Sequence, residues 1–414
     1  MSTRMALVGF SLSQREHLRY DKSLLGDFTH MKKLLFGFAF LSILLAACGP
    51  AAPAASPTPT GPPLASATPQ PPTVTPSPEP SQTPLYPSAG YGPSGFPSNI
   101  NPLTGLQVAD PAILDRRPML IKISNLPRSI RPQYGLSLAD LVFEYYTEEG
   151  ATRFAALFYG RDAQMVGPIR SGRLIDGHLV RGYKAVFAYG GAYYVEMDRF
   201  RASEYADRLV TEGNTTPLFR FDPNGMNNLM ANTAELSAYA TTKGLENGRQ
   251  PLDGMFFQLE APASGQLVTQ LFVRYSGVIY NRWDYDASTG KFLRFSDSDN
   301  DYNNLNEQYK QQVDRLTDQP LAFDNIVILY VPHELYSFGI YDIMFSGSGG
   351  GYAFRDGQGY AITWQRNDTD VVSLTNLDGT SFPFKPGTTW FEVVGVNSQV
   401  EQTDQGLRFI HLMP

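Results

Sequence analysis

A proline-rich stretch near the N-terminus limits most strongly what this chain of 414 residues can fold into. Residues 50–98 hold 16 of the 31 prolines, mixed with alanine, serine and threonine, and carry a single charge, at Glu79. Such a composition cannot bury enough apolar surface to offset the conformational entropy that folding removes. We therefore expect residues 48–98 to form a disordered, polyproline-like linker, with the hydrophobic cores after it.

The segment before this linker has the order of an export signal. Residues 31–33 (Met-Lys-Lys) are a positive start, and the apolar run at 34–47 is too short to span a bilayer. Its end, Leu-Ala-Ala-Cys at 45–48, resembles a bacterial lipobox, in which the cysteine is diacylated and the chain is cut in front of it. We predict a signal peptide at 31–47 and lipidation of Cys48. The alternatives are a signal peptide without lipidation and a buried core helix.

Lipidation would fix where the protein works. Cys48 is the only cysteine, so the chain has no disulfide and its one thiol stands where lipid chemistry would use it. We expect the protein on the extracytoplasmic face of the bacterial cell membrane, with the membrane as a partner through Cys48. Residues 1–30 are polar and charged, unlike a signal peptide, and we predict that they come from a mis-called gene start.

The rest of the chain is long enough for two hydrophobic cores. Short apolar runs alternate with helical patterns over residues 99–265, whereas residues 266–414 are dominated by short strands and tight turns. The predicted fold class is α+β, with an N-terminal α/β-type domain around a mixed sheet (99–265) followed by a β-rich C-terminal domain (266–414). The net charge of −7 and the lack of a basic run argue against a nucleic-acid partner.

Individual elements follow from periodicity and from turn and cap residues. In the first domain we predict strands at 118–123, 141–146, 154–159 and 185–189, and helices at 172–182, 194–210 and 232–243, the last with Asn232 as N-cap and Gly244 after its end. In the second we predict a hairpin at 283–295, a helix or ordered loop at 304–317, strands at 325–331, 341–345, 352–354 and 390–394, and a flexible glycine-rich hairpin tip at 346–351.

The best candidate for a functional site is the run Gly-Pro-Ile-Arg-Ser-Gly-Arg at 167–173, at the start of a predicted helix. Free N–H groups and the positive end of a helix favour an anion, and guanidinium groups fit phosphate or carboxylate. The alternative is a structural network in which the arginines pair with carboxylates of the same domain, namely Asp140, Glu144, Glu148, Glu149 and Asp176. The candidate anion-binding residues are Arg131, Asp140, Arg153, Arg170, Ser171 and Arg173.

Two further carboxylate patterns are less specific. Glu144 and Glu148 are an even step apart, so they would share one face of a strand, either as a glycosidase-like pair or as exposed strand-end residues. Residues 297–301 begin like a calcium loop, but Tyr302 and Gln308 replace the glycine and glutamate that such a loop needs, which favours a solvated acidic turn. We predict no metal and no cofactor, and we name no catalytic residue.

Several motifs together resemble a known family. They lie at residues 101–106, 131–140, 152–154 and 166–171 in the first half, and at 285–286, 378–379 and 386–390 in the second. In this order they are similar to the N-terminal and C-terminal modules of YerB-type bacterial lipoproteins, a family of domains of unknown function. The resemblance implies a two-domain envelope lipoprotein and supplies no mechanism.

A second similarity is to the LytR-CpsA-Psr phosphotransferases, which attach glycopolymers to the cell wall. It rests on the order of Ile169-Arg170 and of residues 188–191, but Ser171 stands where those enzymes have an acid.

Three functional hypotheses follow. The first is a non-enzymatic envelope lipoprotein that binds an anionic or cell-wall-derived ligand through the arginine site. The second is an envelope enzyme that acts on phosphodiester or glycan bonds, with Asp140, Arg153, Arg170 and Arg173 at its centre. The third is a protein-interaction scaffold that uses the β-rich domain as its surface.

Overall fold

The computed structural model describes residues 86–222, 225–404 and 406–413. The predicted signal peptide, Cys48 and the first part of the predicted linker lie outside these residues. The described fold begins before the boundary predicted at residue 99. Tyr91 exchanges two backbone hydrogen bonds with Phe257 (2.9 and 2.8 Å), and Tyr86 and Phe96 pack against the core. These aromatic side chains supply the apolar surface that the proline-rich residues lack.

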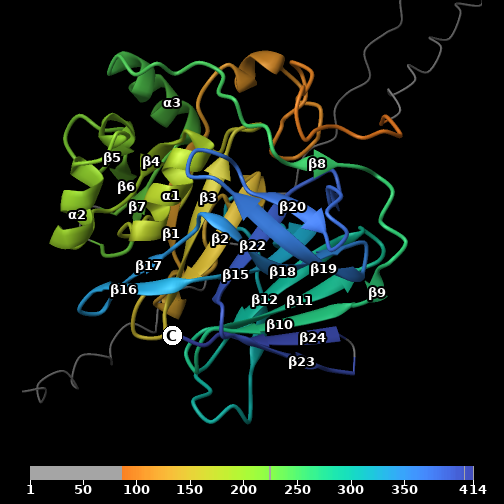
Figure 1. The fold of residues 1–414 in the computed structure, drawn as a ribbon. Coiled ribbons are helices and arrows are strands. Elements are labelled where there is room, and N and C mark those ends of the chain that lie inside the picture. The colour runs from red at the N-terminus through yellow and green to blue at the C-terminus, as the bar shows by residue number, and fades with distance from the viewer. Residues whose placement is uncertain (1–85, 223–224, 405, 414) are drawn as a thin grey trace, which may run out of the picture. The chain divides into compact units, whose positions relative to one another are not determined.

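One mixed sheet of eleven strands runs through the described chain (Figure 1). It takes strands from both predicted domains, and the described residues pack as one compact unit. The connection is made where β2 pairs in parallel with β22, which also pairs in parallel with β15. The strand order is β20 (Ser373–Asn376), β19 (Gln358–Arg366), β18 (Gly347–Arg355), β15 (Asn325–Val331), β22 (Thr389–Gly395), β2 (Leu141–Tyr146), β3 (Thr152–Phe158), β1 (Met119–Ser124), β4 (Val186–Ala188) and β5 (Leu209–Val210), and β9 (Gln266–Leu267) pairs with β19.

A second sheet of seven strands packs on one face of the large one. Its order is β13 (Tyr309–Gln311), β12 (Lys291–Asp297), β11 (Tyr280–Asp286), β10 (Gln270–Arg274), β24 (Gly406–Ile410) and β23 (Gln399–Gln402), and β14 (Ala322–Phe323) pairs with β12. Three two-stranded ribbons complete the β-structure of the described residues: β16 (His333–Ser337) with β17 (Ile340–Ile343), β21 (Pro383–Phe384) with β8 (Phe256–Phe257), and β6 (Phe219–Arg220) with β7 (Leu229–Met230).

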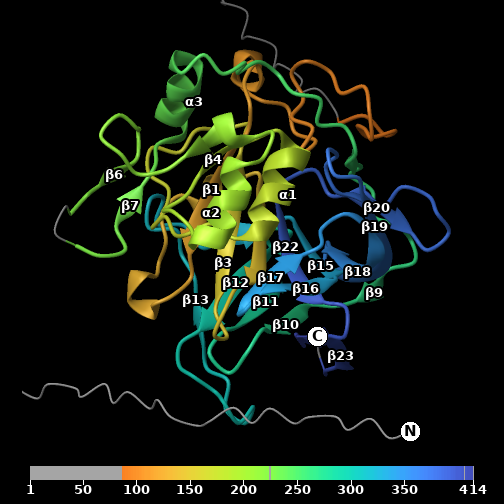
Figure 2. The same cartoon turned by 60° about the vertical axis from the view of Figure 1, so that its left-hand side comes forward.

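The α-helices in the described residues are α1 (Leu174–Tyr183), α2 (Tyr194–Arg201) and α3 (Thr233–Thr242). Short 3₁₀ turns are η1 (Pro111–Leu114), η2 (Arg128–Ile130), η3 (Leu136–Leu138) and η4 (Ala206–Arg208). The fold is therefore strand-rich with few helices. Figure 2 shows α1 and α2 in front of the strands of the large sheet.

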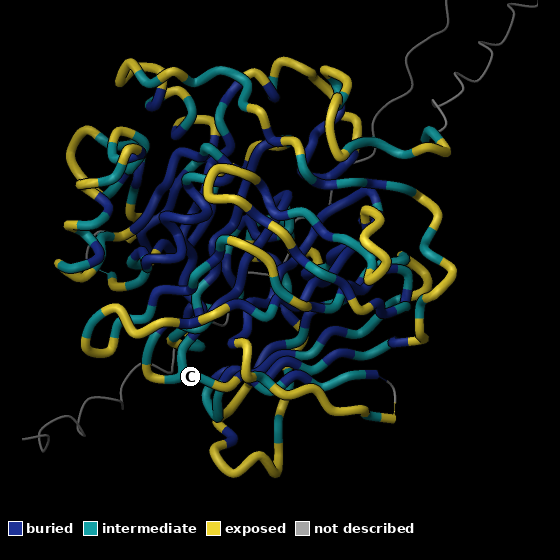
Figure 3. Tube along the Cα trace, in the orientation of Figure 1, coloured by how far each residue is buried: buried dark blue, intermediate teal, exposed yellow. Residues whose placement is uncertain are grey.

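The large sheet is buried on both faces around β2, as the dark strands in Figure 3 show. Because side chains alternate along a strand, Phe143 and Tyr145 belong to one core with Leu179 of α1, whereas Val142 belongs to the other core with Trp283 of the second sheet. A strand covered on both faces needs a nearly continuous apolar sequence. The sequence of β2, Leu-Val-Phe-Glu-Tyr-Tyr, has one charge, at Glu144.

The predicted strand positions agree closely with the structure, and the predicted helix ends agree less well. The strands predicted at 141–146 and 325–331 coincide with β2 and β15. Asn232 caps α3 as predicted, because its Oδ1 accepts hydrogen bonds from two N–H groups of the first turn (3.0 and 3.2 Å). The helix predicted at 194–210 ends at Arg201, where the Ser203 hydroxyl donates to the Phe200 carbonyl oxygen (2.6 Å) and the chain turns.

The glycine-rich run at 346–351 is not the flexible tip that its composition predicts. Residues 347–351 form the first half of β18, which pairs with β15 and β19. A Cβ at Gly349 would come within 2.7 Å of the Trp364 ring, and a Cβ at Gly351 within 2.4 Å of the Ile328 carbonyl oxygen. The glycines allow close packing of neighbouring strands, and composition alone does not distinguish this role from flexibility.

Candidate functional site

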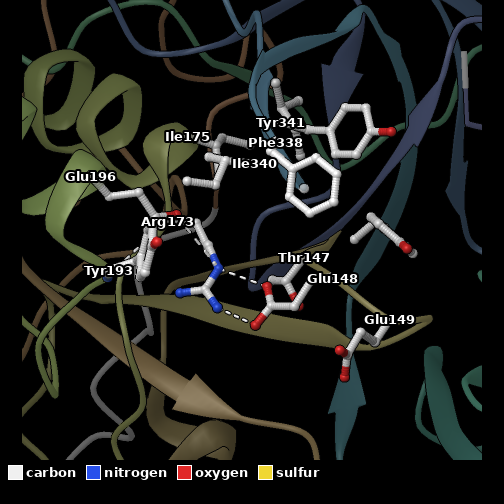
Figure 4. Close-up of a pocket in the computed structure, with 13 residues that line it drawn as sticks. Thr147, Glu148, Glu149, Arg173, Ile175, Tyr193, Glu196, Phe338, Ile340 and Tyr341 are labelled. Atoms are coloured by element: carbon white, nitrogen blue, oxygen red, sulfur yellow. Dashed lines mark hydrogen bonds and ion pairs between the residues drawn. The ribbon is translucent and has the colours of Figure 1, made fainter. Parts of the chain in front are cut away.

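A cavity of about 470 Å³ opens between the starts of α1 and α2 and the β16–β17 hairpin (Figure 4). Charged side chains line one part of it, namely Glu148, Glu149, Arg173 and Glu196. Aromatic and aliphatic side chains line the rest, with Tyr193 and Phe338 at the rim; Phe338 is fully exposed. A concave surface that combines apolar walls with a few polar groups is the usual form of a ligand site.

The two helix starts are positioned in the same way. Arg173 is the N-cap of α1, and Asp176 in the first turn accepts a hydrogen bond from its backbone N–H (2.6 Å). Tyr193 is the N-cap of α2, and Glu196 accepts from its backbone N–H (3.1 Å). An acidic side chain at this position satisfies a free N–H group at the helix start. The two caps therefore place Arg173 and Tyr193 at the cavity.

The cavity floor is formed by Arg173 and Glu148, and Arg153, which is not among the lining residues, also pairs with Glu148. Arg173 donates from Nε to one oxygen of Glu148 (2.8 Å) and from Nη2 to the other, while Arg153 donates to that second oxygen from Nη2 (2.7 Å). The side chains of Arg153 and Arg173 are 12 and 17 % exposed. Burial opposes ionisation of Glu148, but the two guanidinium groups hold its pKa below the ordinary value. The two cations thus share Glu148, and Arg173 has a second carboxylate partner in Glu196 (3.6 Å).

A buried polar network lies behind this floor. Lys122 on β1 donates to the Tyr145 hydroxyl and to Asp176 (3.1 Å), and the Tyr145 hydroxyl donates to Asp176. Burial lowers the pKa of Lys122 to about 7, although Asp176 acts in the opposite direction; the nearby Arg153 and Arg173 lower it further. The network joins the sheet to the first turn of α1, because Asp176 also holds the backbone of Arg173.

Of the six residues predicted for the anion site, three come together. Arg153 and Arg173 meet on Glu148, and Ser171 contributes its carbonyl oxygen, which accepts from Arg153 Nη1 (2.9 Å). The Ser171 hydroxyl was the predicted ligand group, so its contribution differs in kind. Glu148, one of the acids predicted to balance the arginines, pairs with both of them.

The other three predicted residues lie elsewhere. Arg131 is held by Asp297 at the end of β12 (3.1 Å), and Arg170 is exposed and donates to Asn227 (2.8 Å). Asp140 is buried at the opposite end of β2, about 20 Å from the cavity floor at 3.3 Å per residue. It accepts from Asn101 Nδ2 (2.8 Å) and Tyr159 N (2.5 Å), and burial raises its pKa. Asp140 therefore does not lie with the arginines, as the enzyme hypothesis required.

The weaker carboxylate patterns also resolve into ion pairs. Glu144 is buried between the two sheets, and Glu148 lies at the cavity, so the two do not face one substrate. Asp297 pairs with Arg128 and Arg131, and Asp301 with Arg274 (3.5 Å). Within the described ranges, no group of three or more histidine, cysteine, aspartate or glutamate side chains is arranged to hold a metal ion.

Sequence reasoning missed a second polar cluster, the inter-sheet cluster of Glu144, Glu392 and Arg294. Glu144 and Glu392 are register partners on β2 and β22, and both are fully buried. Arg294 of the second sheet donates to Glu144 (2.6 Å) and to Glu392 (3.2 Å), with its guanidinium 4.3 Å from the centre of the Trp390 ring. Burial and the neighbouring Glu144 raise the pKa of Glu392 to about 8. The cluster therefore sets two carboxyl groups against one cation, and burial together with Glu144 favours the protonated form of Glu392.

Fold and site together define a strand-rich protein with a partly charged cavity between two helix starts and a hairpin. Two family models match the chain: the N-terminal domain of a protein family of unknown function (DUF3048) at residues 103–246, and the C-terminal domain of the same family at residues 271–391. The chain belongs to this family, that of the YerB-type proteins, as the motifs in its sequence predicted.

One relative is YerB of Bacillus subtilis (strain 168), which carries a provisional lipoprotein name. It is 28% identical over 300 residues, which are 71% of this chain and 85% of the relative. The crystal structure of the YerB protein from Bacillus subtilis is similar, with a TM-score of 0.59 and 26% identity over 71% of this chain and 96% of that one. No helix in the part of the chain that the structure describes is long and apolar enough to span a membrane.

Proposed function

We propose that this protein is a lipid-anchored envelope protein that binds an anionic, cell-wall-derived ligand in the cavity lined by Arg173 and Glu148. Residues 45–48 supply the anchor at Cys48, on the extracytoplasmic face of the membrane, and the lipoprotein name of the Bacillus relative supports it. Two acyl chains give stable attachment where one does not. Such an anchor would hold the cavity outside the cell, within reach of wall material.

The observation that carries the ligand class is the sharing of one carboxylate by two largely buried guanidinium groups. Arg153 and Arg173 bring two positive charges, Glu148 pairs with both of them, and Glu196 pairs with Arg173 at 3.6 Å. A carboxylate or phosphate of the ligand can take the place of Glu148, whose side chain is 33 % exposed and sits on the turn after β2. Guanidinium pairs favour such anions because they offer parallel N–H donors.

Calorimetric titration of the purified protein tests this function. The probes are inorganic phosphate, a phosphate-bearing lipid-linked wall precursor and uncharged wall glycan fragments. We expect the anionic probes to bind and Arg173→Gln to weaken them by about tenfold or more, the loss of one charge-assisted hydrogen bond. Arg170→Gln is the matched control, because Arg170 faces Asn227 instead of the cavity.

Two results would reject the proposal. One is binding of the uncharged glycan alone, which would remove the role of the arginines. The other is anion binding that Arg170→Gln abolishes and Arg173→Gln leaves intact. Thermal unfolding of each variant separates lost binding from lost folding.

A further inference from the structure

A group of exposed aromatic and aliphatic side chains lies at the mouth of the cavity. Its members, between 49 and 100 % exposed, are Tyr193 and Tyr194 at the start of α2, and Leu335, Tyr336 and Phe338 in the β16–β17 hairpin. We call this group the rim patch. Single apolar residues on a protein surface are ordinary, whereas a group of them marks a place where the protein meets a partner.

The hairpin presents Phe338 at its tip. Ser337 and Ile340 are strand partners, so Phe338 and Gly339 form the turn between them, with Gly339 at a φ of +72°. Polar residues and glycine dominate such turns. A fully exposed phenylalanine at this position gains no burial within the fold, so a partner outside the fold is needed to cover its ring.

The base of the hairpin is fastened to the body of the protein. Asp342 of β17 accepts a hydrogen bond from Arg199 of α2 (2.7 Å) and lies 3.2 Å from Nε2 of His178 of α1. The Arg199 guanidinium also lies 5.1 Å from the centre of the Tyr336 ring. This cation beside the rim patch is already paired with Asp342, so we expect apolar contact to contribute more than charge to binding at the patch.

The length of chain before Tyr86 indicates what covers the rim patch. The proposed anchor at Cys48 holds the protein at a bilayer, and residues 49–85 join the anchor to the fold. As a polyproline-like chain they would reach about 115 Å at 3.1 Å per residue, whereas a body of this size is about 50 Å across. The first described residues (orange) and the hairpin lie apart in Figures 1 and 2, and such a linker is long enough for the hairpin to meet the membrane.

The side chains of the rim patch suit a membrane surface. A tyrosine places its apolar ring among acyl chains and its hydroxyl among headgroups, which is why this residue is common where proteins enter a bilayer. Tyr193 and Phe338 also line the cavity, so a membrane that covers the patch lies at the cavity mouth. In Figure 4, Phe338 stands on the hairpin side of the Arg173–Glu148 pair and Tyr193 on the side of α2.

We propose that the rim patch docks on the lipid bilayer that holds the anchor, with Phe338 inserted at the boundary between headgroups and acyl chains. This inference rests on the proposed function, because it needs the anchor at Cys48. Docking turns the cavity mouth toward the headgroups, so an anionic ligand carried on a lipid enters the cavity from that side. The contact is non-covalent.

Tryptophan fluorescence of the anchored protein tests the docking. The three native tryptophans, Trp283, Trp364 and Trp390, are fully buried, so an indole introduced by Phe338→Trp reports on its own surroundings. The mature variant is reconstituted through its lipid into phosphatidylcholine vesicles with brominated or with ordinary acyl chains. We expect brominated chains to quench the emission of the introduced indole, because bromine quenches an indole only at close range.

Matched variants and salt make the test specific. Leu267→Trp places an indole at another highly exposed apolar position, on β9, and its emission should be the same in both kinds of vesicle. Tyr194→Ser, added to Phe338→Trp, should lower the ratio of docked to undocked protein by about tenfold, as for the loss of one buried aromatic side chain. Salt at about 1 M should leave the quenching unchanged, because it screens charge and not apolar burial.

The outcomes separate this inference from the proposed function. If Phe338→Trp floats with the vesicles and is not quenched, docking is rejected and the anchor stands. If the chain does not float and mass spectrometry shows an unacylated Cys48, the anchor and the docking are rejected together, while titration still decides anion binding at Arg173. Quenching that high salt removes overturns the apolar mechanism. An emission change that grows with protein density in both kinds of vesicle would assign the patch to a second copy and overturn the inference.

Discussion

Two glutamates of one chain segment have opposite surroundings. Glu144 on β2 is fully buried in the inter-sheet cluster, where it accepts from Arg294, Thr152 (2.7 Å) and Asn125 (3.2 Å). Glu148, in the turn after β2, pairs with two arginines at the edge of a cavity and is one-third exposed. A glutamate side chain is thus a fixed part of the core at position 144, whereas at position 148 it can exchange its partners.

The difference lies in what surrounds each charge. A buried carboxylate requires fixed partners, because leaving it unpaired costs several kcal/mol. A partly exposed carboxylate can leave its partners, because water replaces them at small cost. The inter-sheet cluster should therefore control stability, and the cavity floor should control binding. Four changes, in order of expected effect, test this division.

The largest effect is expected for Arg294→Met. The substitution leaves Glu144 without its cation, while the methionine side chain still fills the space beside the Trp390 ring. We expect the free energy of unfolding to fall by about 3–5 kcal/mol, the usual loss when one partner of a buried ion pair is removed. Urea denaturation at neutral pH measures it. A loss under about 1 kcal/mol would mean that the cluster is no more important than a surface pair.

The next effect depends on pH and concerns Glu392. Its folded pKa of about 8 lies above the ordinary value, so the folded state keeps a proton that the unfolded state releases. Stability should then be highest at about pH 5 and fall as the pH rises to about 8. The Tyr275 hydroxyl donates to a Glu392 carboxyl oxygen (3.0 Å), and the amide oxygen of a glutamine can accept the same hydrogen bond. Glu392→Gln should remove this slope.

The comparison is made at two pH values. We expect Glu392→Gln to equal the parent at about pH 5 and to exceed its free energy of unfolding by about 1 kcal/mol or more at about pH 8.5. If the free energies of unfolding of the two proteins change with pH in parallel, Glu392 is ionised in the folded state. Glu246→Gln, at an exposed carboxylate, controls for surface charge.

A smaller effect on stability is expected for Glu148→Gln. The Glu148 side chain is one-third exposed, so solvent screening limits the loss to about 1 kcal/mol or less. Anion binding should become tighter, because the competing carboxylate is gone from Arg153 and Arg173. Urea denaturation and titration with inorganic phosphate measure the two quantities. Weaker phosphate binding would contradict the division between the inter-sheet cluster and the cavity floor. A loss in free energy of unfolding as large as that for Arg294→Met would contradict it too.

The smallest effect is expected for Arg170→Ala. Arg170 is exposed and donates to Asn227, so its removal should change the free energy of unfolding by less than about 0.5 kcal/mol. Phosphate affinity should also stay within error. A clear loss of affinity would extend the site beyond the cavity floor and restore the wider set of arginines that the sequence suggested.

Local patterns predicted the elements well and the site in part. The apolar run of β2 and the Asn232 cap act within a few residues, and both are found in the structure. Arg153 and Arg173 were identified from their residue types, because few other side chains bind anions as guanidinium does. Arg131 and Asp140 were assigned to the same site because they lie in the same predicted domain. Each has its own partners instead, at Asp297 and at Asn101.

By itself the sequence determined strands such as β2 and β15, the cap at Asn232 and the family to which the chain belongs, because these depend on neighbouring residues and on short motifs. Only the tertiary structure decided that β2 pairs with β22, which sets Glu144 beside Glu392 and unites strands of both family modules in one sheet. It also decided that Phe338 of a distant hairpin lines the same cavity as Arg173. Register between remote strands is fixed by the packing of whole faces, and no local pattern contains that information.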